Sequence, residues 1–268
     1  MTFEPGKATV VTDEALLATY GRAFRKVGKS VVLVPLSTGV HAGHIELIRA
    51  AKSLLGAYVF VSFEGEEVPE VFAEEKVDVV FHGTLPTAAR VSTGGECLED
   101  AEGVERGAAK HLALCNATHA TDLVLGEKDF ELLVATQLAV SGLRMEVKLH
   151  SVPTVRMPNG LALSLRNERV AEDAHDQALA LSAALTAGAH AAEHGAETVL
   201  DTVRGVLEAA GVAPAYLAVR DLAMREAPAQ GDARLLAAID LPATDGGTVR
   251  LHDNVGLPLG IGCKHIED

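Results

Sequence analysis

The chain has 268 residues, and its hydrophobic share of 48% is enough for a full core, either in one large α/β domain or in a large domain followed by a smaller one. Its 37 acidic and 23 basic residues give a formal net charge of −14, and the basic residues form no run, so a nucleic-acid partner is not expected. No apolar run approaches the roughly 20 residues of a membrane span, and acids and a glycine interrupt the N-terminal segment where a signal peptide is apolar, so we expect a soluble protein with no membrane partner.

The cysteines indicate neither a disulfide framework nor a zinc site. Cys97, Cys115 and Cys263 are an odd number of thiols, and no two of them have a CxxC spacing. We therefore expect a protein of the reducing cytoplasm.

The first part of the chain alternates short, valine-rich apolar runs with helical segments. Such runs predict strands that are buried on both faces of a parallel sheet, joined by right-handed crossovers. The predicted strands cover residues 30–36, 57–63, 77–83, 121–126 and 145–155, and the predicted helices cover residues 44–56, about 107–116 and 129–143.

The pattern changes at about Asn167. Two long alanine-rich helices are predicted at 171–195 and 196–211, followed by strand-like stretches around 216–222, 233–241 and 248–255. This order predicts a second, smaller α+β domain.

The turn after the first predicted strand reads PLSTGVHAGH, from Pro35 to His44. Ligands of α/β proteins bind at such turns, because the N–H groups and the dipole of a helix N-terminus favour a phosphate. His41 and His44 are three residues apart and can point toward the same anion. The alternatives are a surface turn with incidental histidines and an HxxH metal pair that lacks its other ligands, but the place of the pair on this turn favours the anion site.

A second candidate turn, GEKDF, runs from Gly126 to Phe130 and follows the fourth predicted strand. Lys128 can neutralise a triphosphate, and Asp129 can bind a ribose hydroxyl or a magnesium ion. The alternative is an acidic first turn that caps a helix. The carboxyl ends of parallel strands lie at the same edge of a sheet, so the two turns together predict a single binding cleft.

A third segment, VPTVRMPNGLALSLRNERV, joins the two predicted domains. Its Ser164 and Arg166 offer a hydroxyl and a guanidinium that can close over phosphate from the second domain. A hinge there would let the second domain shut the site and protect a reactive intermediate from water. The alternative is a helix N-cap region with solvated charges.

In this order, the three segments resemble the signatures of the pantothenate synthetase (pantoate–β-alanine ligase) family. PLSTGVHAGH is similar without a gap to the family's PTMGALHEGH, GEKD is intact, and VPTVRMPNGLALSLRN is similar to VPTVRxxxGLAxSSRN. The resemblance covers most of the chain and reaches DNV at Asp253 to Val255, which is similar to the family's DNI. HxGH alone is moderately specific, whereas the three segments in order are hard to obtain by chance.

The resemblance implies a fold and an activity. The fold is a Rossmann-like, ATP-binding parallel-sheet domain of the HxGH nucleotidyltransferase type at residues 1–154, with a smaller α+β lid domain at residues 155–268. The activity is ATP-dependent ligation: a carboxylate attacks the α-phosphate of ATP to give an acyl-adenylate and pyrophosphate, and an amine then displaces AMP. Magnesium and a homodimer with its interface in the N-terminal domain are also implied.

The resemblance further implies roles for individual residues. His41 would be the catalytic proton donor, and His44, Lys128 and Arg166 would complete the catalytic set by binding phosphates. Gly126 and Asp129 would meet the ribose, Asp129 is the candidate magnesium contact, and the backbone of Val155 would meet the adenine. The implied ATP-binding residues are Ser37, Thr38, Gly39, Gly43, His44, Gly126, Glu127, Lys128, Asp129, Val155, Leu163, Ser164, Leu165 and Arg166.

The acid-binding half departs from the family pattern. SFEGEEVPE replaces VNPxQF and its pantoate-binding glutamine, and the acidic loop that follows is largely deleted. Leu132 occupies the position of a second such glutamine, Ser37 and Leu165 replace a methionine and a serine, and RPTHF has no counterpart near residues 99–104. Losing two amides that bind one hydroxy acid costs several kcal/mol, so we expect poor use of pantoate, or none, with the adenylation machinery kept.

Three interpretations remain open. The first is a ligase with an altered acid pocket, the second a nucleotidyltransferase of the same fold, and the third a non-catalytic nucleotide-binding paralogue. GEKD and SxRN favour the ligase over the nucleotidyltransferase. The acid and the amine are not identified by the sequence.

Overall fold

The computed structural model describes residues 3–94 and 96–261. The chain divides into two compact units, with the boundary between Val155 and Arg156. Of the three cysteines, Cys97 and Cys115 are free thiols, and Cys263 lies outside the described residues. None of the helices in the described part has the length and apolar character needed to cross a membrane.

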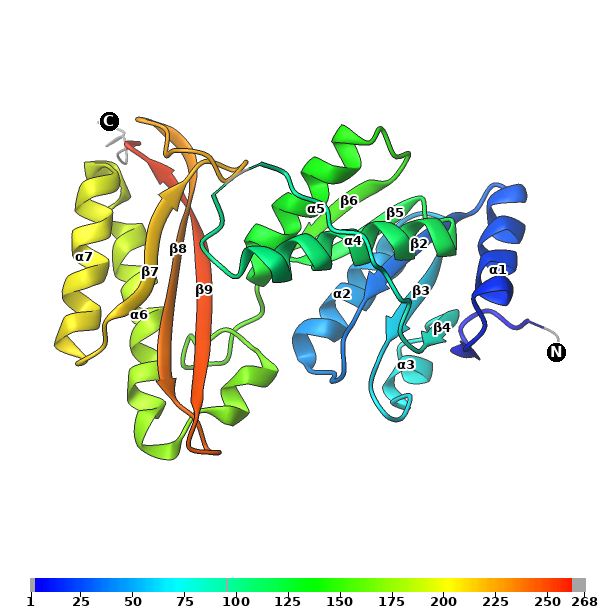
Figure 1. Cartoon of the computed structure of the whole chain (residues 1–268), viewed down its shortest axis with the longest axis horizontal. Coiled ribbons are helices and arrows are strands. Elements are labelled where there is room, and N and C mark those ends of the chain that lie inside the picture. Colours follow the sequence, from blue (N-terminus) through cyan, green and yellow to red (C-terminus); the bar gives the residue numbers. More distant parts are fainter. Residues whose placement is uncertain (1–2, 95, 262–268) are drawn as a thin grey trace, which may run out of the picture. The chain divides into compact units, whose positions relative to one another are not determined.

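The first unit contains a six-stranded, all-parallel sheet with the strand order β1-β4-β3-β2-β5-β6 (Figure 1). The predicted α/β fold with a parallel sheet is thereby confirmed. The strands are β1 (Thr9–Val11), β2 (Ser30–Pro35), β3 (Ala57–Phe63), β4 (Val79–His82), β5 (Asp122–Gly126) and β6 (Lys148–Val152). The edge strand β1 was not predicted.

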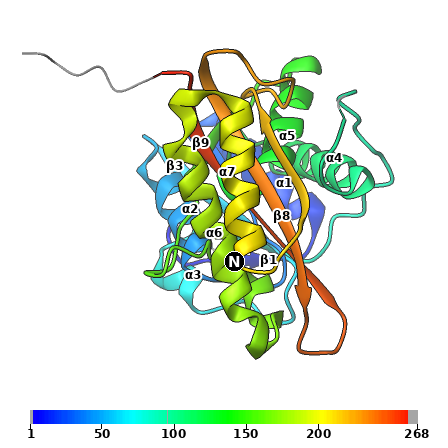
Figure 2. The same cartoon turned by 90° about the vertical axis from the view of Figure 1, so that its left-hand side faces the viewer.

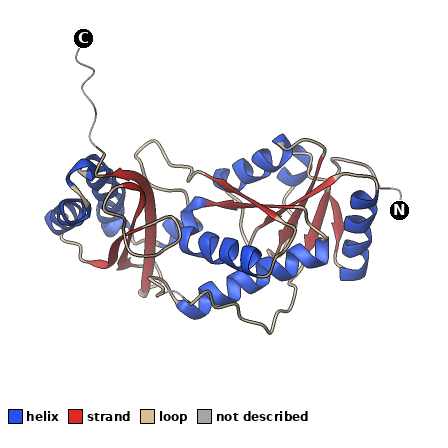
Figure 3. Cartoon of the chain, turned by 90° about the horizontal axis from the view of Figure 1, so that it is seen from above, coloured by secondary structure: helices blue, strands red, loops and turns tan. Residues whose placement is uncertain are grey.

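Helices cover both faces of this sheet (Figure 3). They are α1 (Glu14–Lys26), α2 (Ala42–Ser53), α3 (Val71–Glu74), α4 (Ala101–Thr118) and α5 (Phe130–Gly142), and the 3-10 turn η1 (Glu127–Asp129) precedes α5. Helix α2 packs against β2, β3 and β5, whereas α1 and α4 pack on each other and on β2. Because both faces are covered, β2 is apolar after Ser30, and its residues 31–34 are fully buried.

The connections leave the sheet in opposite directions on the two sides of β2. The chain passes from β2 to β3 on one side, whereas β5 pairs with β2 on the other side, at Val32 and Leu33. The turns after β2 and β5 therefore lie side by side at the carboxyl edge of the sheet. Open α/β sheets bind their ligands at such a reversal of strand order.

The second unit is an antiparallel three-stranded sheet with helices packed on one face (Figure 2). Its elements are β7 (Pro214–Arg220), β8 (Gly231–Pro242), β9 (Thr248–Leu259), α6 (His175–His190), α7 (Ala196–Ala209) and the 3-10 turns η2 (Leu165–Arg169), η3 (Glu172–Ala174) and η4 (Ala192–His194). Gly188 lets α6 and α7 approach closely, because a Cβ atom there would lie 2.5 Å from Val203. The predicted smaller α+β part is confirmed.

Candidate functional site

His41 and His44 lie at the start of α2, at the carboxyl edge of the first unit's sheet. His41 is the N-cap residue, and its Nδ1 accepts a hydrogen bond from the N–H of Gly43 at 3.1 Å. The N–H of His41 in turn donates to Nδ1 of His44 at 3.3 Å. The two imidazole rings stack with their centroids 3.9 Å apart. Backbone capping therefore orients both rings.

These hydrogen bonds also determine which ring nitrogens can donate. A nitrogen that accepts a hydrogen bond carries no proton, so each neutral imidazole carries its proton on Nε2. Burial, and next the neighbouring His41, lower the pKa of His44 to about 4, although Asp129 acts in the opposite direction. His44 is thus neutral at pH 7 and presents an Nε2–H group beside a helix N-terminus, which suits a phosphate oxygen.

Gly43 is required by the close approach of the His41 ring. A Cβ atom at this position would lie 2.9 Å from Cε1 and 3.0 Å from Nδ1 of His41. The same Cβ would lie 4.0 Å from the Cβ of Val155, so the last residue of the first unit is close to the HxGH turn. Ser37, Thr38 and Gly39 form the rest of the turn between β2 and α2, where Ser37 and Thr38 are exposed.

The GEKD segment lies beside this turn, at the end of the neighbouring strand β5. A Cβ atom at Gly126 would lie 3.7 Å from the side chain of Leu47 on α2, and the charge of Asp129 acts on His44. Asp129 is the N-cap residue of α5 but makes no side-chain capping hydrogen bond, so as a cap it acts on the helix only through its charge. His41, His44 and the GEKD segment are thus brought together at one sheet edge.

The turn after β3 is attached to the same edge. The N–H of Glu64 donates to the carbonyl of Ser37 at 3.0 Å, and Oε2 of Glu64 lies 2.6 Å from Nζ of Lys110 on α4. Oε1 of Glu64 and Oγ1 of Thr154, which follows β6, are buried without hydrogen-bond partners among the described residues. Buried polar atoms are normally paired, so a polar ligand or an ordered water at this edge would satisfy them.

Sequence reasoning missed Lys110 and its neighbour His111, which lie near this edge. Nδ1 of His111 lies 3.0 Å from Oγ1 of Thr136 on α5, and Lys110 pairs with Glu64. Their signal in the sequence is weak, since they are only two polar residues in the alanine-rich stretch GAAKHLALC. Their partners are far along the chain, so only the folded structure reveals the contacts.

The remaining predicted site residues, Leu163 to Arg166, belong to the second unit. Oγ of Ser164 accepts a hydrogen bond from the N–H of Arg166 at 3.2 Å, so Ser164 caps η2, in agreement with the alternative interpretation of this residue. Nη1 of Arg166 donates to Nδ1 of the buried His252 on β9 at 2.8 Å. The guanidinium of Arg156 forms a two-pronged contact with Asp253, at 2.6 and 3.0 Å.

No metal site is apparent within residues 3–94 and 96–261. This part of the chain contains no group of three or more His, Cys, Asp or Glu side chains that could hold a metal ion. The interpretation of His41 and His44 as an HxxH metal pair therefore gains no further ligand.

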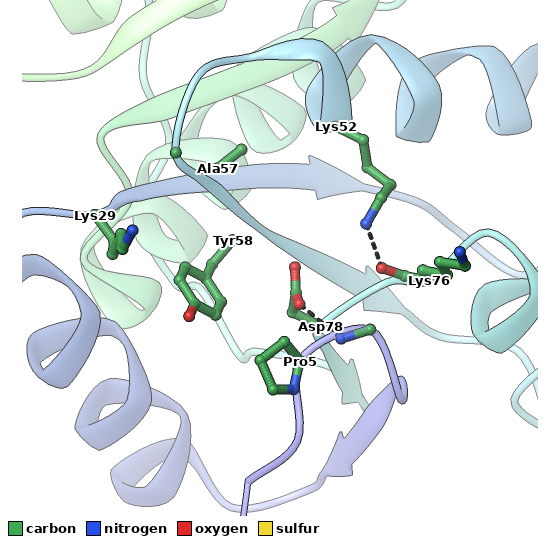
Figure 4. A pocket seen from close by; sticks show the side chains of 9 residues that line it. Pro5, Lys29, Lys52, Ala57, Tyr58, Lys76 and Asp78 are labelled. Atoms are coloured by element: carbon green, nitrogen blue, oxygen red, sulfur yellow. Dashed lines mark hydrogen bonds between the residues drawn. The ribbon is translucent and has the colours of Figure 1, made fainter.

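A cavity of about 400 Å³ lies at the opposite, amino edge of the first unit's sheet (Figure 4). Lys29, Lys52 and Lys76 line it, and each follows or ends a helix, where the helix dipole favours a cation. Nζ of Lys52 donates to the carbonyl of Lys76, and the carboxylate of Asp78 accepts from the N–H groups of Gly6 and Val59. The fold accounts for these charges, and the converging helix C-termini disfavour a bound anion.

Comparison with known sequences identifies close relatives. The family model described as pantoate-beta-alanine ligase matches residues 69–256. The pantothenate synthetase of Corynebacterium jeikeium (strain K411) is 39% identical over an alignment of 300 residues, gaps included. The alignment covers 100% of this chain and 96% of the relative. The pantothenate synthetase of Mycolicibacterium smegmatis (strain ATCC 700084 / mc(2)155) is 37% identical over 290 residues, which cover 96% of this chain and 90% of the relative.

Solved structures share the fold at lower sequence identity. The pantothenate synthetase from Thermus thermophilus superposes with a TM-score of 0.77 at 24% identity, covering 92% of this chain and 98% of the other. The pantoate-beta-alanine ligase from Francisella tularensis, solved in complex with beta-gamma ATP and beta-alanine, gives a TM-score of 0.67 at 22% identity and covers 92% and 97% of the two chains.

Proposed function

The chain belongs to the pantoate–β-alanine ligase family, and we propose that it is an ATP-dependent ligase that joins a small hydroxy acid to an amine of the β-alanine type. The observation that supports the proposal best is the stacked pair of His41 and His44, oriented by the backbone at the switch between β2 and β5, with the GEKD segment on the adjacent strand.

The proposed reaction has two steps. In the first, an oxygen of the acid's carboxylate attacks the α-phosphorus of ATP, and the bond to the bridging oxygen breaks, so that an acyl-adenylate forms and pyrophosphate leaves. In the second, the amine attacks the acyl carbon and loses a proton, and AMP leaves with the electron pair of the broken C–O bond. No covalent bond to the enzyme is needed, so catalysis consists of positioning and of stabilising charge on phosphorus.

The roles of the residues follow from their chemistry. Nε2–H of His44 and the N-terminus of α2 would bind phosphate oxygens, and Nε2–H of His41 would donate a hydrogen bond to the departing pyrophosphate. Lys128 would neutralise phosphate charge, Gly126 and Asp129 would meet the ribose, and the backbone of Val155 would meet the adenine. From the second unit, Ser164 and Arg166 would contribute a hydroxyl and a guanidinium for the triphosphate. The other members of the proposed ATP site are Ser37, Thr38, Gly39, Gly43, Glu127, Leu163 and Leu165.

Magnesium is part of the proposal. Mg²⁺ in ATP-using enzymes is held by one or two carboxylates together with substrate phosphates, rather than by an all-protein cage. The exposed carboxylate of Asp129 beside Lys128 fits that pattern. The ion would neutralise charge on the pyrophosphate group.

We also propose a cytoplasmic homodimer whose interface lies in the N-terminal domain. Light scattering tests it, since the dimer should have twice the mass of the 28.0 kDa chain.

The acid pocket is expected to bind pantoate weakly. The side chain of Leu132 packs against Gly107 of α4, since a Cβ atom at Gly107 would lie 2.8 Å from Cδ1 of Leu132. An apolar group therefore stands where the family has an amide for the acid. Leu132→Gln should raise kcat/KM for pantoate by about tenfold, the value of one hydrogen bond. Efficient use of pantoate by the wild type, with no gain from Leu132→Gln, would contradict this view of the pocket.

Product analysis separates the ligase from its alternatives. With ATP, magnesium, pantoate and β-alanine, the ligase should form AMP and pyrophosphate in equal amounts, and sustained AMP release should require both the acid and the amine. A nucleotidyltransferase would release pyrophosphate without AMP, and a non-catalytic paralogue would bind ATP and release neither. Either of these outcomes would overturn the proposed function.

A further inference from the structure

A chain of hydrogen bonds joins α4 to α5 beside Leu132. The hydroxyl of Thr136, which is fully buried, donates to the carbonyl of Leu132 at 2.8 Å. Oγ1 of the same threonine lies 3.0 Å from Nδ1 of His111. His111 stands one helical turn after Gly107, the residue against which the Leu132 side chain packs. The imidazole of His111 is therefore a near neighbour of the position where the family's amide has been lost.

The direction of these hydrogen bonds determines the tautomer of His111. A threonine hydroxyl has one proton, and here it is used on the carbonyl of Leu132. Toward His111 the hydroxyl must accept, so Nδ1 of His111 carries the imidazole proton and Nε2 has a lone pair. Burial and, to a lesser extent, Lys110 lower the pKa of His111 to about 4 against the opposing effect of Asp129, so the ring is neutral at pH 7. His111 thus has the opposite tautomer to His41 and His44.

The acceptor nitrogen is available to a ligand. Nε2 of His111 has no hydrogen-bond partner among residues 3–94 and 96–261, and the side chain is only partly exposed. The charge of Asp129 acts on both His111 and His44, which places His111 within electrostatic reach of the proposed ATP site. A lone acceptor needs a donor, and a hydroxy acid supplies one through its hydroxyl group, whereas its carboxylate and the phosphates of ATP have no proton to donate.

We propose that His111 is a specificity-determining residue of the acid site, whose Nε2 accepts a hydrogen bond from a hydroxyl group of a small hydroxy acid. This inference rests on the proposed ligase function and names the polar contact that replaces a lost amide. Pantoate carries two hydroxyl groups. His111 accepts a hydrogen bond from one of them, whereas the apolar side chain of Leu132 offers no hydrogen bond to the other. A purely structural role, in which His111 only ties α4 to α5, is the alternative that the experiments must separate.

Nitrogen NMR of protein labelled at its histidines tests the contact without turnover, with His111→Gln identifying the signal. In the free enzyme, Nε2 of His111 should be unprotonated, and saturation with pantoate, without ATP, should shift that signal. Of the two deoxy analogues of pantoate, each lacking one hydroxyl, one should fail to produce the shift. A protonated Nε2 in the free enzyme, or a signal that moves with neither pantoate nor its analogues, or only with β-alanine, would overturn the inference.

Kinetics provide a second test. His111→Leu should lower kcat/KM for pantoate by about 30-fold through KM, because a buried hydroxyl is left unpaired, while KM for ATP stays unchanged. With the deoxy analogue that lacks the contacting hydroxyl, the same substitution should lower kcat/KM by less than about threefold, because the interaction is already absent. Equal losses with both acids would indicate a structural role and overturn the inference. Asn116→Leu, at an exposed position on the same helix, is the matched control and should change neither value.

The two arms separate this inference from the proposed function. A wild-type enzyme that forms no product from any acid would refute the ligase, whereas the NMR arm still decides whether His111 binds a hydroxy acid.

Discussion

At the scale of single residues, backbone N–H groups orient the two HxGH histidines. His41 accepts from Gly43, and His44 accepts from His41 itself, so the geometry is contained in four consecutive residues. A local motif of this kind can be recognised in a sequence and carried to the structure intact. His111 differs, because its orientation depends on Thr136, which is 25 residues further along the chain.

The cap and the chemistry of His41 can be separated by substitution. His41→Asn keeps a good N-cap acceptor and removes the imidazole, so we expect the unfolding free energy to change by less than about 0.5 kcal/mol while the adenylation rate falls by about 100-fold or more. His41→Ala should lower the adenylation rate by a similar factor and, in addition, lower the unfolding free energy by about 1 kcal/mol. Urea unfolding and acid-dependent AMP formation measure the two quantities. Full activity in His41→Asn would refute a role of the imidazole in the reaction.

Two partly buried histidines predict a pH dependence of stability. His44 and His111 both have a pKa lowered to about 4 from the ordinary value of 6.5, mainly by burial. Between these values the unfolded chain binds protons that the folded protein excludes, so stability is fully present above pH 6.5 and is lost as the pH falls toward 4. His111→Gln should weaken this dependence in thermal unfolding at pH 7, 6 and 5. An unchanged slope in that variant would contradict the assignment.

At the scale of elements, the contact between Arg156 and Asp253 fastens the signature segment to β9 over a sequence separation of 97 residues. The carboxylate of Asp253 is 3% exposed. It accepts hydrogen bonds from Nη1 and Nη2 of Arg156 and from the N–H of Asn254. Such an arrangement is costly to break, because removing one partner leaves a buried charge uncompensated.

Asp253→Ala should therefore lower the unfolding free energy of the protein by about 3 kcal/mol. The matched control is Asp240→Ala, which removes the exposed pair with Arg250 and should cost less than about 1 kcal/mol. Denaturant unfolding followed by circular dichroism measures both changes. Similar losses in the two variants would contradict the importance assigned to burial.

The elements also show what a sequence can and cannot predict. The strand at 30–36 was predicted because its apolar run is continuous, which is the pattern of a strand covered on both faces. Strand β1 was missed because it has three residues and only Val11 is buried, so its identity depends on pairing with β4, far away in the sequence. The turns after β2 and β5 were predicted from local motifs, whereas the pairing of Lys110 with Glu64 required the fold.

At the scale of the whole molecule, a chain with a net charge of −14 must bind a triphosphate. The proposed answer is local: the N-termini of α2 and α5, the histidine N–H groups and Lys128 lie at one sheet edge, where they favour an anion although Glu64 and Asp129 are close by. The lysine-lined cavity at the amino edge shows the reverse arrangement, because there the cations meet helix C-termini. The polarity of an α/β sheet thus assigns anion binding to one edge.

The exchange of labelled pyrophosphate into ATP, with the acid present and the amine absent, measures acyl-adenylate formation alone. We expect exchange that depends on a small hydroxy acid, needs no amine, and falls by about 100-fold or more in Lys128→Ala, because an ammonium that balances transition-state charge is removed. Exchange without any acid, or no exchange with pantoate or related hydroxy acids by a protein that ATP still stabilises against heat, would contradict this expectation.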